Sequence, residues 1–390
     1  MLLIRKNQKI IFSQNKQTIF FISIFLSVPT FFSVISIALP KLNQQVIGTN
    51  LGSVVSLFVV VSSFILLYIF NTRKVFEINL QLFFPILTLT TFAVISGIIL
   101  GQSWLAPLGI LIIQLLALTN QLTKSEIWIS GLYSLLSIST ELLVLSIFFP
   151  IFENCRSDKC FVFPQVFSTS IGGNGLGLDL FSLIILVIFL SEMSLFDKWI
   201  FIISSGLLLL NASSRTGLFS FLFVVHLFAF KNLYIKFRLL PLLFWMIVAY
   251  TLFPIWGTYS EKSFTERGYL WIYAKSLAGE AGITGLGTSY WTRLGTSHGF
   301  PSNYGTHNIW LDTLIAFGVI GLILFVWILV NFGLKCPDHQ LKLLFLSALF
   351  TGMNESTLII WKMYPNSILL ILMLMNWNLK EKNMVREYRI

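Results

Sequence analysis

A polar stretch of the chain, residues 257–307, carries side chains whose types could do chemistry. Its basic residues and histidines are Lys262, Arg267, Lys275, Arg293, His298 and His307. The planar guanidinium of arginine can grip a phosphate through two parallel hydrogen bonds, so the stretch favours an anionic ligand. The alternative is a solvated loop whose charges serve no ligand.

His307 stands in Thr306-His307-Asn308, directly before an apolar segment that begins near residue 308. The positive end of a helix starting there would favour the neutral imidazole. A neutral histidine in that position can act as a general base toward a hydroxyl group. A structural cap or an interfacial histidine is the alternative interpretation.

Arg215 lies in the polar segment 211–217, between the apolar runs 199–212 and 217–230. A helix of about 14 residues is only about 21 Å long, against a hydrocarbon core of about 30 Å. If both runs cross a membrane, Arg215 lies below the outer surface, where an arginine needs a partner or a wet cavity. A snorkelling arginine at a helix end is the alternative.

Three carboxylates fall inside apolar runs, those of Glu141, Asp179 and Glu355. They could pair with Arg215 or Arg267 and line one outward-open cavity. Hydrogen bonds between packed helices are an equal alternative. The Asp, Glu and His residues lack the spacing of metal ligands, so we expect no metal site.

The elements that position these residues must lie in a membrane, because the composition excludes an ordinary soluble protein. Of 390 residues, 56% are hydrophobic and 11% charged, and the mean hydropathy is +0.84. About twelve apolar runs are long enough to cross the bilayer as helices. They lie near 18–39, 51–70, 80–100, 104–119, 127–150, 175–195, 199–212, 217–230, 239–256, 308–331, 342–360 and 366–379. We expect an all-α, polytopic integral membrane bundle that forms one domain over residues 1–390.

The basic residues orient this bundle. A net charge of +10 in a membrane protein marks cytoplasmic loops rather than nucleic-acid binding. Treating 199–230 as two spans keeps more of the basic residues on the cytoplasmic side than one long span would. Both termini are then cytoplasmic, the first span is retained, and the loops 151–174 and 257–307 face outward. Residues 265–274 predict a short amphipathic helix at the interface.

The outer loop 151–174 contains Cys155 and Cys160. On an oxidising face of the membrane these cysteines either form a small-loop disulfide or stay as two thiols. The glycine-rich runs 172–177 and 282–287 match no nucleotide fingerprint, because no strand precedes them.

Four motifs occur in order along the second half of the chain: Ser214-Arg215-Thr216-Gly217, Arg267 with Trp271, Gly285-Leu286-Gly287, and Thr306-His307-Asn308 before an apolar helix with Gly318 and Gly321. Together they resemble the O-antigen ligase and O-antigen polymerase family, by motif over a catalytic region of about residues 199–331 and elsewhere by span count. The resemblance implies a metal-independent glycosyltransferase of the C type without a cofactor. It also implies the bacterial inner membrane, with membrane lipids as partners and an active site facing the periplasm.

The same resemblance implies substrates and roles. The donor is a glycan linked to undecaprenyl diphosphate, and the acceptor is a hydroxyl of a second glycan or of a lipid A core, so ligase and polymerase both stay open. Arg215 and Arg267 would hold the diphosphate, and His307 would be the base. Family members often carry a further arginine near the sixth span. None stands close to Asn174 here, and Arg156 or Arg293 could replace it. The supporting residues that we expect are Arg293, Glu355, Glu141 and Asn308.

A polysaccharide flippase or another multi-span transporter is the rival function, since it also has about twelve spans and buried charges. A transporter is expected to have internal repeats and helices broken near the membrane midplane. The sequence shows neither clearly.

Overall fold

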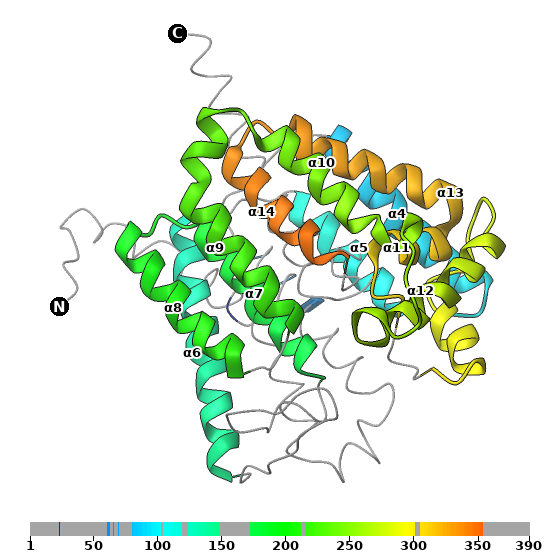
Figure 1. The fold of residues 1–390 in the computed structure, drawn as a ribbon, viewed down its shortest axis with the longest axis horizontal. Coiled ribbons are helices and arrows are strands. Elements are labelled where there is room, and N and C mark those ends of the chain that lie inside the picture. The colour runs from blue at the N-terminus through cyan, green and yellow to red at the C-terminus, as the bar shows by residue number, and fades with distance from the viewer. Residues whose placement is uncertain are drawn as a thin grey trace.

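The computed structural model describes residues 80–102, 104–118, 124–148, 172–211, 215–300 and 305–353, with the isolated residues 23, 61, 62, 65 and 69. Every regular element in these parts is a helix (Figure 1). The predicted spans 18–39, 51–70 and 366–379 lie almost wholly outside the described residues. So do Cys155, Cys160, Arg156 and Glu355, and the side chains of Glu141 and Asp179.

Most described helices follow the predicted spans closely, but the predicted span 342–360 is wrong at its end, since the helix there stops at Thr351. The first half contains α4 (Leu80–Ile99), α5 (Leu105–Leu118), α6 (Lys124–Phe148), α7 (Gly172–Leu190) and α8 (Leu195–Asn211). The second half contains α9 (Arg215–Lys236), α10 (Leu240–Thr251), α11 (Phe253–Trp256), α12 (Ser263–Glu280), the π-helix η5 (Trp291–Gly295), α13 (Ile309–Val330), the π-helix η6 (Asn331–Lys335) and α14 (His339–Thr351). Among the described residues, two helices are long and apolar enough to cross a membrane by length and composition alone, Arg215–Lys236 and Ile309–Lys335. The all-helical fold is confirmed over the described residues, and its apolar helices are consistent with an integral membrane protein, whereas the count of about twelve spans stays a prediction.

One predicted span was too short. The apolar run 217–230 ends at polar residues, but α9 continues through them to Lys236 and has 22 residues. Other residues of α9 provide the contacts that these polar side chains need. The His226 ring forms a hydrogen bond with the Tyr234 hydroxyl at 2.8 Å, and the Lys231 ammonium lies 5.0 Å from the Phe228 ring. At 1.5 Å per residue α9 is about 33 Å long. The length argument therefore no longer requires Arg215, the first residue of α9, to lie below the outer surface.

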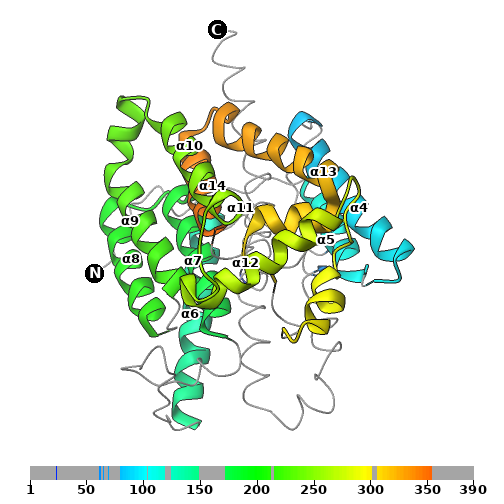
Figure 2. The same cartoon turned by 45° about the vertical axis from the view of Figure 1, so that its right-hand side comes forward.

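Two helices form the centre of the bundle. Residues 180–190 of α7 and 341–349 of α14 are all buried, as expected for helices that are apolar on every side. Helix α7 packs against α6, α8, α9 and α14, and α14 also packs against α9 and α10. Helices α4, α5 and α13 form a neighbouring group, and α12 packs against α13 (Figure 2).

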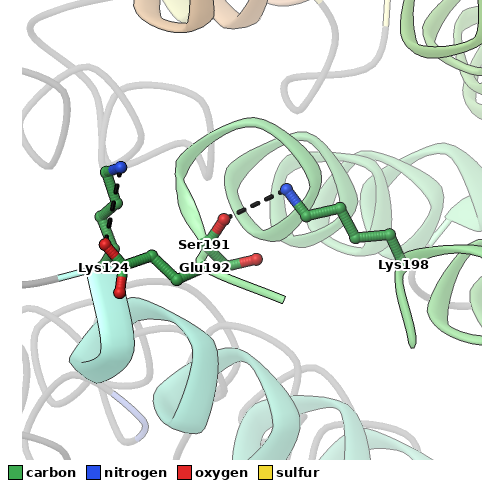
Figure 3. Close-up of polar contacts among 4 residues, drawn as sticks. All are labelled: Lys124, Ser191, Glu192 and Lys198. Atoms are coloured by element: carbon green, nitrogen blue, oxygen red, sulfur yellow. Dashed lines mark hydrogen bonds and ion pairs between the residues drawn. The ribbon is translucent and has the colours of Figure 1, made fainter. Parts of the chain in front are cut away.

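Two buried lysines close helix ends at the face predicted to be cytoplasmic. The Lys198 ammonium, from the start of α8, donates to the Ile188 carbonyl at the end of α7 at 2.7 Å. It also donates to the carbonyl of Ser191, just after α7, at 3.1 Å (Figure 3). The Lys342 ammonium likewise donates to the Leu334 carbonyl in η6 at 2.9 Å. A cation suits the negative end of a helix and satisfies carbonyls that have no intrahelical partner.

Candidate active site

Arg267 reaches the first turn of α9, where Arg215 begins the helix. Both terminal nitrogens of its guanidinium lie 3.5 Å from the Thr216 hydroxyl oxygen, although 51 residues separate the two in sequence. Arg215 is exposed, Arg267 is half-buried and Thr216 is buried. The N-terminus of a helix carries a positive partial charge and stabilises anions, not cations. Two arginines at this end of α9 therefore make a positive locus of the kind that favours an anionic ligand.

Helix α12 fixes the position of Arg267. Its buried face holds Leu270, Trp271, Ala274 and Leu277, which confirms and extends the predicted amphipathic helix. The Trp271 ring, one turn after Arg267, is fully buried and packs edge-on against Tyr259 at 5.3 Å. The Lys275 ammonium lies 4.7 Å from the centre of the same Tyr259 ring. Burial raises the pKa of Tyr259 to about 12 and lowers the pKa of Lys275, so the phenol stays neutral beneath its cation.

His307 lies in a tight turn that leads into α13. Its φ is 52°, in the left-handed region that residues other than glycine rarely adopt. On the far side of the turn, the Asn308 side chain caps α13 by accepting from the backbone of Trp310 at 3.2 Å and Leu311 at 3.1 Å. The Thr306 hydroxyl accepts from the Asn308 N–H at 3.2 Å and donates to its carbonyl at 2.9 Å. These bonds hold His307 in its strained conformation.

The same turn is tied to the ends of two other helices. The Asn308 amide donates to the Thr251 carbonyl at the end of α10, at 2.8 Å, and the Trp310 indole donates to the Thr251 hydroxyl at 2.9 Å. The Ile309 N–H donates to the carbonyl of Gly352, just after α14, at 3.0 Å. The His307 turn therefore lies where α10, α13 and α14 meet.

Aromatic rings connect this junction with the start of α9. The Phe350 ring of α14 stacks on Phe223 of α9 at 3.9 Å and on Tyr250 of α10 at 5.0 Å, and it contacts Phe219 at 5.4 Å. Phe219 lies one turn after Arg215, and Tyr250 precedes Thr251. The N-terminus of α9 and the His307 turn therefore lie at one end of the bundle, on either side of Phe350.

Helix α13 is broken at Gly318, whose φ is 62° and ψ −154°. The loop 282–287 fills the break with its own backbone. Leu286 and Gly287 donate to the carbonyls of Ile315 and Ala316 at 2.7 and 3.0 Å, and the carbonyls of Gly282 and Ile283 accept from Val319 and Ile320 at 3.3 and 3.2 Å. No clear sign of this break is present in the sequence. Because protein backbone fills it, it satisfies the helix rather than lining a transport cavity.

The segment just after the loop 282–287 supports the His307 turn. In this segment the Tyr290 hydroxyl donates to the Asp312 carboxylate in the first turn of α13. Asp312 is 2% exposed, and a Cβ placed on Gly305 would lie 3.8 Å from both of its carboxylate oxygens. The carboxylate therefore faces the segment that leads into His307. Sequence reasoning assigned no role to Tyr290 or Asp312, although an acidic residue at the start of an apolar span signals a buried partner.

Two predicted supporting residues have structural contacts. Arg293 is exposed in η5 and donates to the Leu286 carbonyl at 3.3 Å, so it braces the loop 282–287. Asn308 is fully buried and serves as the cap and anchor described above. Glu141 lies in α6, but its side chain is outside the described residues, as is all of Glu355.

Comparison with known proteins places these residues in a family segment. The family model described as O-antigen ligase matches residues 199–326, from α8 into α13. No curated protein and no solved structure shows significant similarity to the chain. The matched segment contains Arg215, Arg267 and His307, and the match confirms the predicted resemblance to the O-antigen ligase and polymerase family over residues 199–326.

Proposed function

We propose that this protein transfers a glycan from undecaprenyl diphosphate to an acceptor hydroxyl at the periplasmic face of the bacterial inner membrane, without a metal ion. The coarser statement, a glycosyltransferase of ligase or polymerase type, follows from the family match. The observation that carries the finer proposal is the guanidinium of Arg267 at the N-terminus of α9, beside Arg215.

The diphosphate is the natural anion for this positive locus. In the reaction the bond between the anomeric carbon and the diphosphate oxygen breaks, and the diphosphate leaves with the bonding electrons. Two guanidinium groups at a helix N-terminus can neutralise the charge that grows on the leaving oxygens. Such fixed cations do the work that a bound metal ion does in other transferases.

His307 completes the proposed chemistry. The acceptor hydroxyl oxygen attacks the anomeric carbon, and its proton passes to the imidazole. The rigid turn between Thr306 and Asn308 fixes the ring's backbone, which supports a positioned base because proton transfer needs hydrogen-bond distance. Attack opposite the leaving diphosphate would invert the anomeric centre. Ligase and polymerase share these steps and differ only in the acceptor.

The test is complementation of a deletion strain with wild type, His307→Ala, Arg215→Ala and Arg267→Ala, at matched membrane abundance. Lys262→Ala is the matched control, because Lys262 is an exposed cation of the same outer segment. We expect wild type and the control to restore long surface glycan on a gel and the other three to fail. A defect limited to a single capped repeat means a polymerase, and intact lipid-linked polymer without its final acceptor means a ligase. Normal glycan from all three variants would overturn the proposal and favour the transporter.

A further inference from the structure

Helix α12 presents a second, unburied face that the proposed chemistry does not use. Tyr269, Tyr273, Ser276 and Glu280 follow one another at helical spacing along it. Tyr269 is 45% exposed, and Ser276 and Glu280 are exposed, whereas Tyr273 is half-buried. This face therefore combines aromatic rings with hydroxyl and carboxylate groups.

Two residues from the segment after η5 pack against these rings, namely His298, which is exposed, and Phe300, which is 8% exposed. The His298 ring lies 4.2 Å from that of Tyr273, and the Phe300 ring lies 4.9 Å from Tyr269 and 5.3 Å from Tyr273. Trp291, which is 2% exposed, packs behind them at 5.1 Å from Phe300. Tyr269, Tyr273, His298 and Phe300 together are called the aromatic platform below.

Hydrogen bonds fix the platform in place. The Tyr273 hydroxyl donates to the Leu294 carbonyl at 2.8 Å and lies 3.0 Å from Nδ1 of His298. Burial, with the charge of Glu280 and the neighbouring Tyr269, raises the pKa of Tyr273, so the phenol keeps its proton. With that proton donated to Leu294, Nδ1 of His298 is the donor to the phenol oxygen, and Nε2 stays available as an acceptor. The rings are thus held ready for a ligand rather than ordered by it.

We infer that the aromatic platform binds a sugar ring of the lipid-linked glycan. A pyranose has apolar C–H faces that stack on aromatic rings and a rim of hydroxyls that need hydrogen-bond partners. The platform offers ring faces with Nε2 of His298, the Ser276 hydroxyl and the Glu280 carboxylate beside them. An acyl chain would instead need a continuous apolar surface, which Ser276 and Glu280 interrupt.

The platform begins close to Arg267 along α12 but on another side of the helix. Tyr269 follows Arg267 by two residues, which is about 3 Å along the helix axis and about 200° around it. The inference rests on the proposed function, because it takes the ligand to be the glycan whose diphosphate Arg267 holds. A sugar chain leaving that diphosphate would pass around the first turns of α12 to reach Tyr269 and then Tyr273.

The test uses a soluble glycan, released by mild acid from the lipid-linked pool of the expressing strain. Saturation-transfer NMR with the purified full-length protein measures its binding. We expect Tyr269→Ala and His298→Ala to weaken binding about three- to tenfold, as loss of an aromatic contact does. Tyr269→Phe, which keeps the ring, should bind like wild type. Trp256→Ala is the control, since Trp256 is a 66% exposed aromatic residue outside the platform.

Each outcome decides one proposal. The glycan carries no diphosphate, so Arg267→Ala should bind it normally and still fail in transfer. Absence of binding to wild type, or equal binding by wild type and Tyr269→Ala, overturns the platform and leaves the transferase untouched. Platform-dependent binding together with normal transfer by Arg267→Ala and His307→Ala would leave the platform standing and overturn the proposed function.

Discussion

Replacing Gly318 by alanine should destabilise the protein, because the break in α13 has no room for a Cβ. A Cβ there would lie 2.4 Å from the carbonyl carbon and oxygen of Ile283 and 2.6 Å from the Gly282 oxygen. Those atoms are backbone and belong to the loop that fills the break, so a rotamer change cannot relieve the contact.

The expected loss in the free energy of unfolding follows from the contacts that the added Cβ would disrupt. The loop and the broken helix share four backbone hydrogen bonds, and losing all of them would cost about 2–6 kcal/mol. Holding alanine at a φ of 62° and a ψ of −154°, a region open essentially to glycine alone, adds about 1–3 kcal/mol. We expect a net loss of about 4 kcal/mol, a large part of the roughly 5–15 kcal/mol that stabilises a typical protein.

The assay is thermal unfolding of the detergent-purified protein, followed by tryptophan fluorescence. Gly318→Ala should lower the apparent Tm by about 5 °C or more. Two controls separate clash from backbone strain. Gly279 lies in α12 with nothing within 4 Å of its Cβ position, so Gly279→Ala should be neutral or slightly stabilising. Gly299 has a φ of +83° but equally open space, so Gly299→Ala should show strain alone.

One result would refute this reasoning. If Gly318→Ala unfolds at the temperature of wild type and of Gly279→Ala, then α13 runs straight through residue 318. The loop 282–287 would then have no break to fill, and its hydrogen bonds with α13 could not exist as described.

Three further changes test other contacts. Arg267→Lys keeps the charge but loses the planar fork, so transfer should fall about tenfold or more with an unchanged Tm, measured with a lipid-linked donor in vitro. Tyr290→Phe removes a hydrogen bond from buried Asp312, and it should lower the free energy of unfolding by about 1–3 kcal/mol, measured by denaturant titration. Lys198→Met removes the donor to two carbonyls at the end of α7 and should cost about 1–3 kcal/mol, while Lys198→Arg should recover part of the loss; equal melting of all three proteins would contradict this.

The apolar runs predicted the helices well because membrane helices must satisfy their backbone internally and match the bilayer thickness. The predicted runs 80–100 and 104–119 became Leu80–Ile99 and Leu105–Leu118. The prediction was wrong where polar residues were taken as a helix end. In α9, the partners of His226 and Lys231 lie on the same helix, so these residues do not end it.

The break in α13 could not be predicted from the sequence, for a different reason. Gly318 stands in an uninterrupted apolar run, and isolated glycines are common in membrane helices. The loop 282–287 looked like a simple set of turns. Only when the two segments meet does each supply the other's missing hydrogen bonds, and such a long-range pairing has no local signature.

In the candidate site, too, local sequence signals were predictable and long-range contacts were not. Residue types and order predicted Arg215, Arg267 and His307 as candidates, but not how they are held. Arg267 depends on Trp271 and Thr216, and His307 depends on Thr251 and the end of α14. Asn308 shows the limit of reasoning from type alone, because the residue next to the candidate base serves as a buried cap.

The broken helix gives the His307 turn its rigidity. A continuous α13 would satisfy its own backbone and need no contact with the loop 282–290. Because Gly318 exposes carbonyls and N–H groups, the loop must bind there, and its far end then brings Tyr290 to Asp312 in the first turn of α13. The same helix start is fixed to α10 and α14 through Asn308 and Ile309. A break more than two turns away from His307 thus supports the turn in which the proposed base lies, and Gly318→Ala should reduce transfer even at temperatures where the protein stays folded.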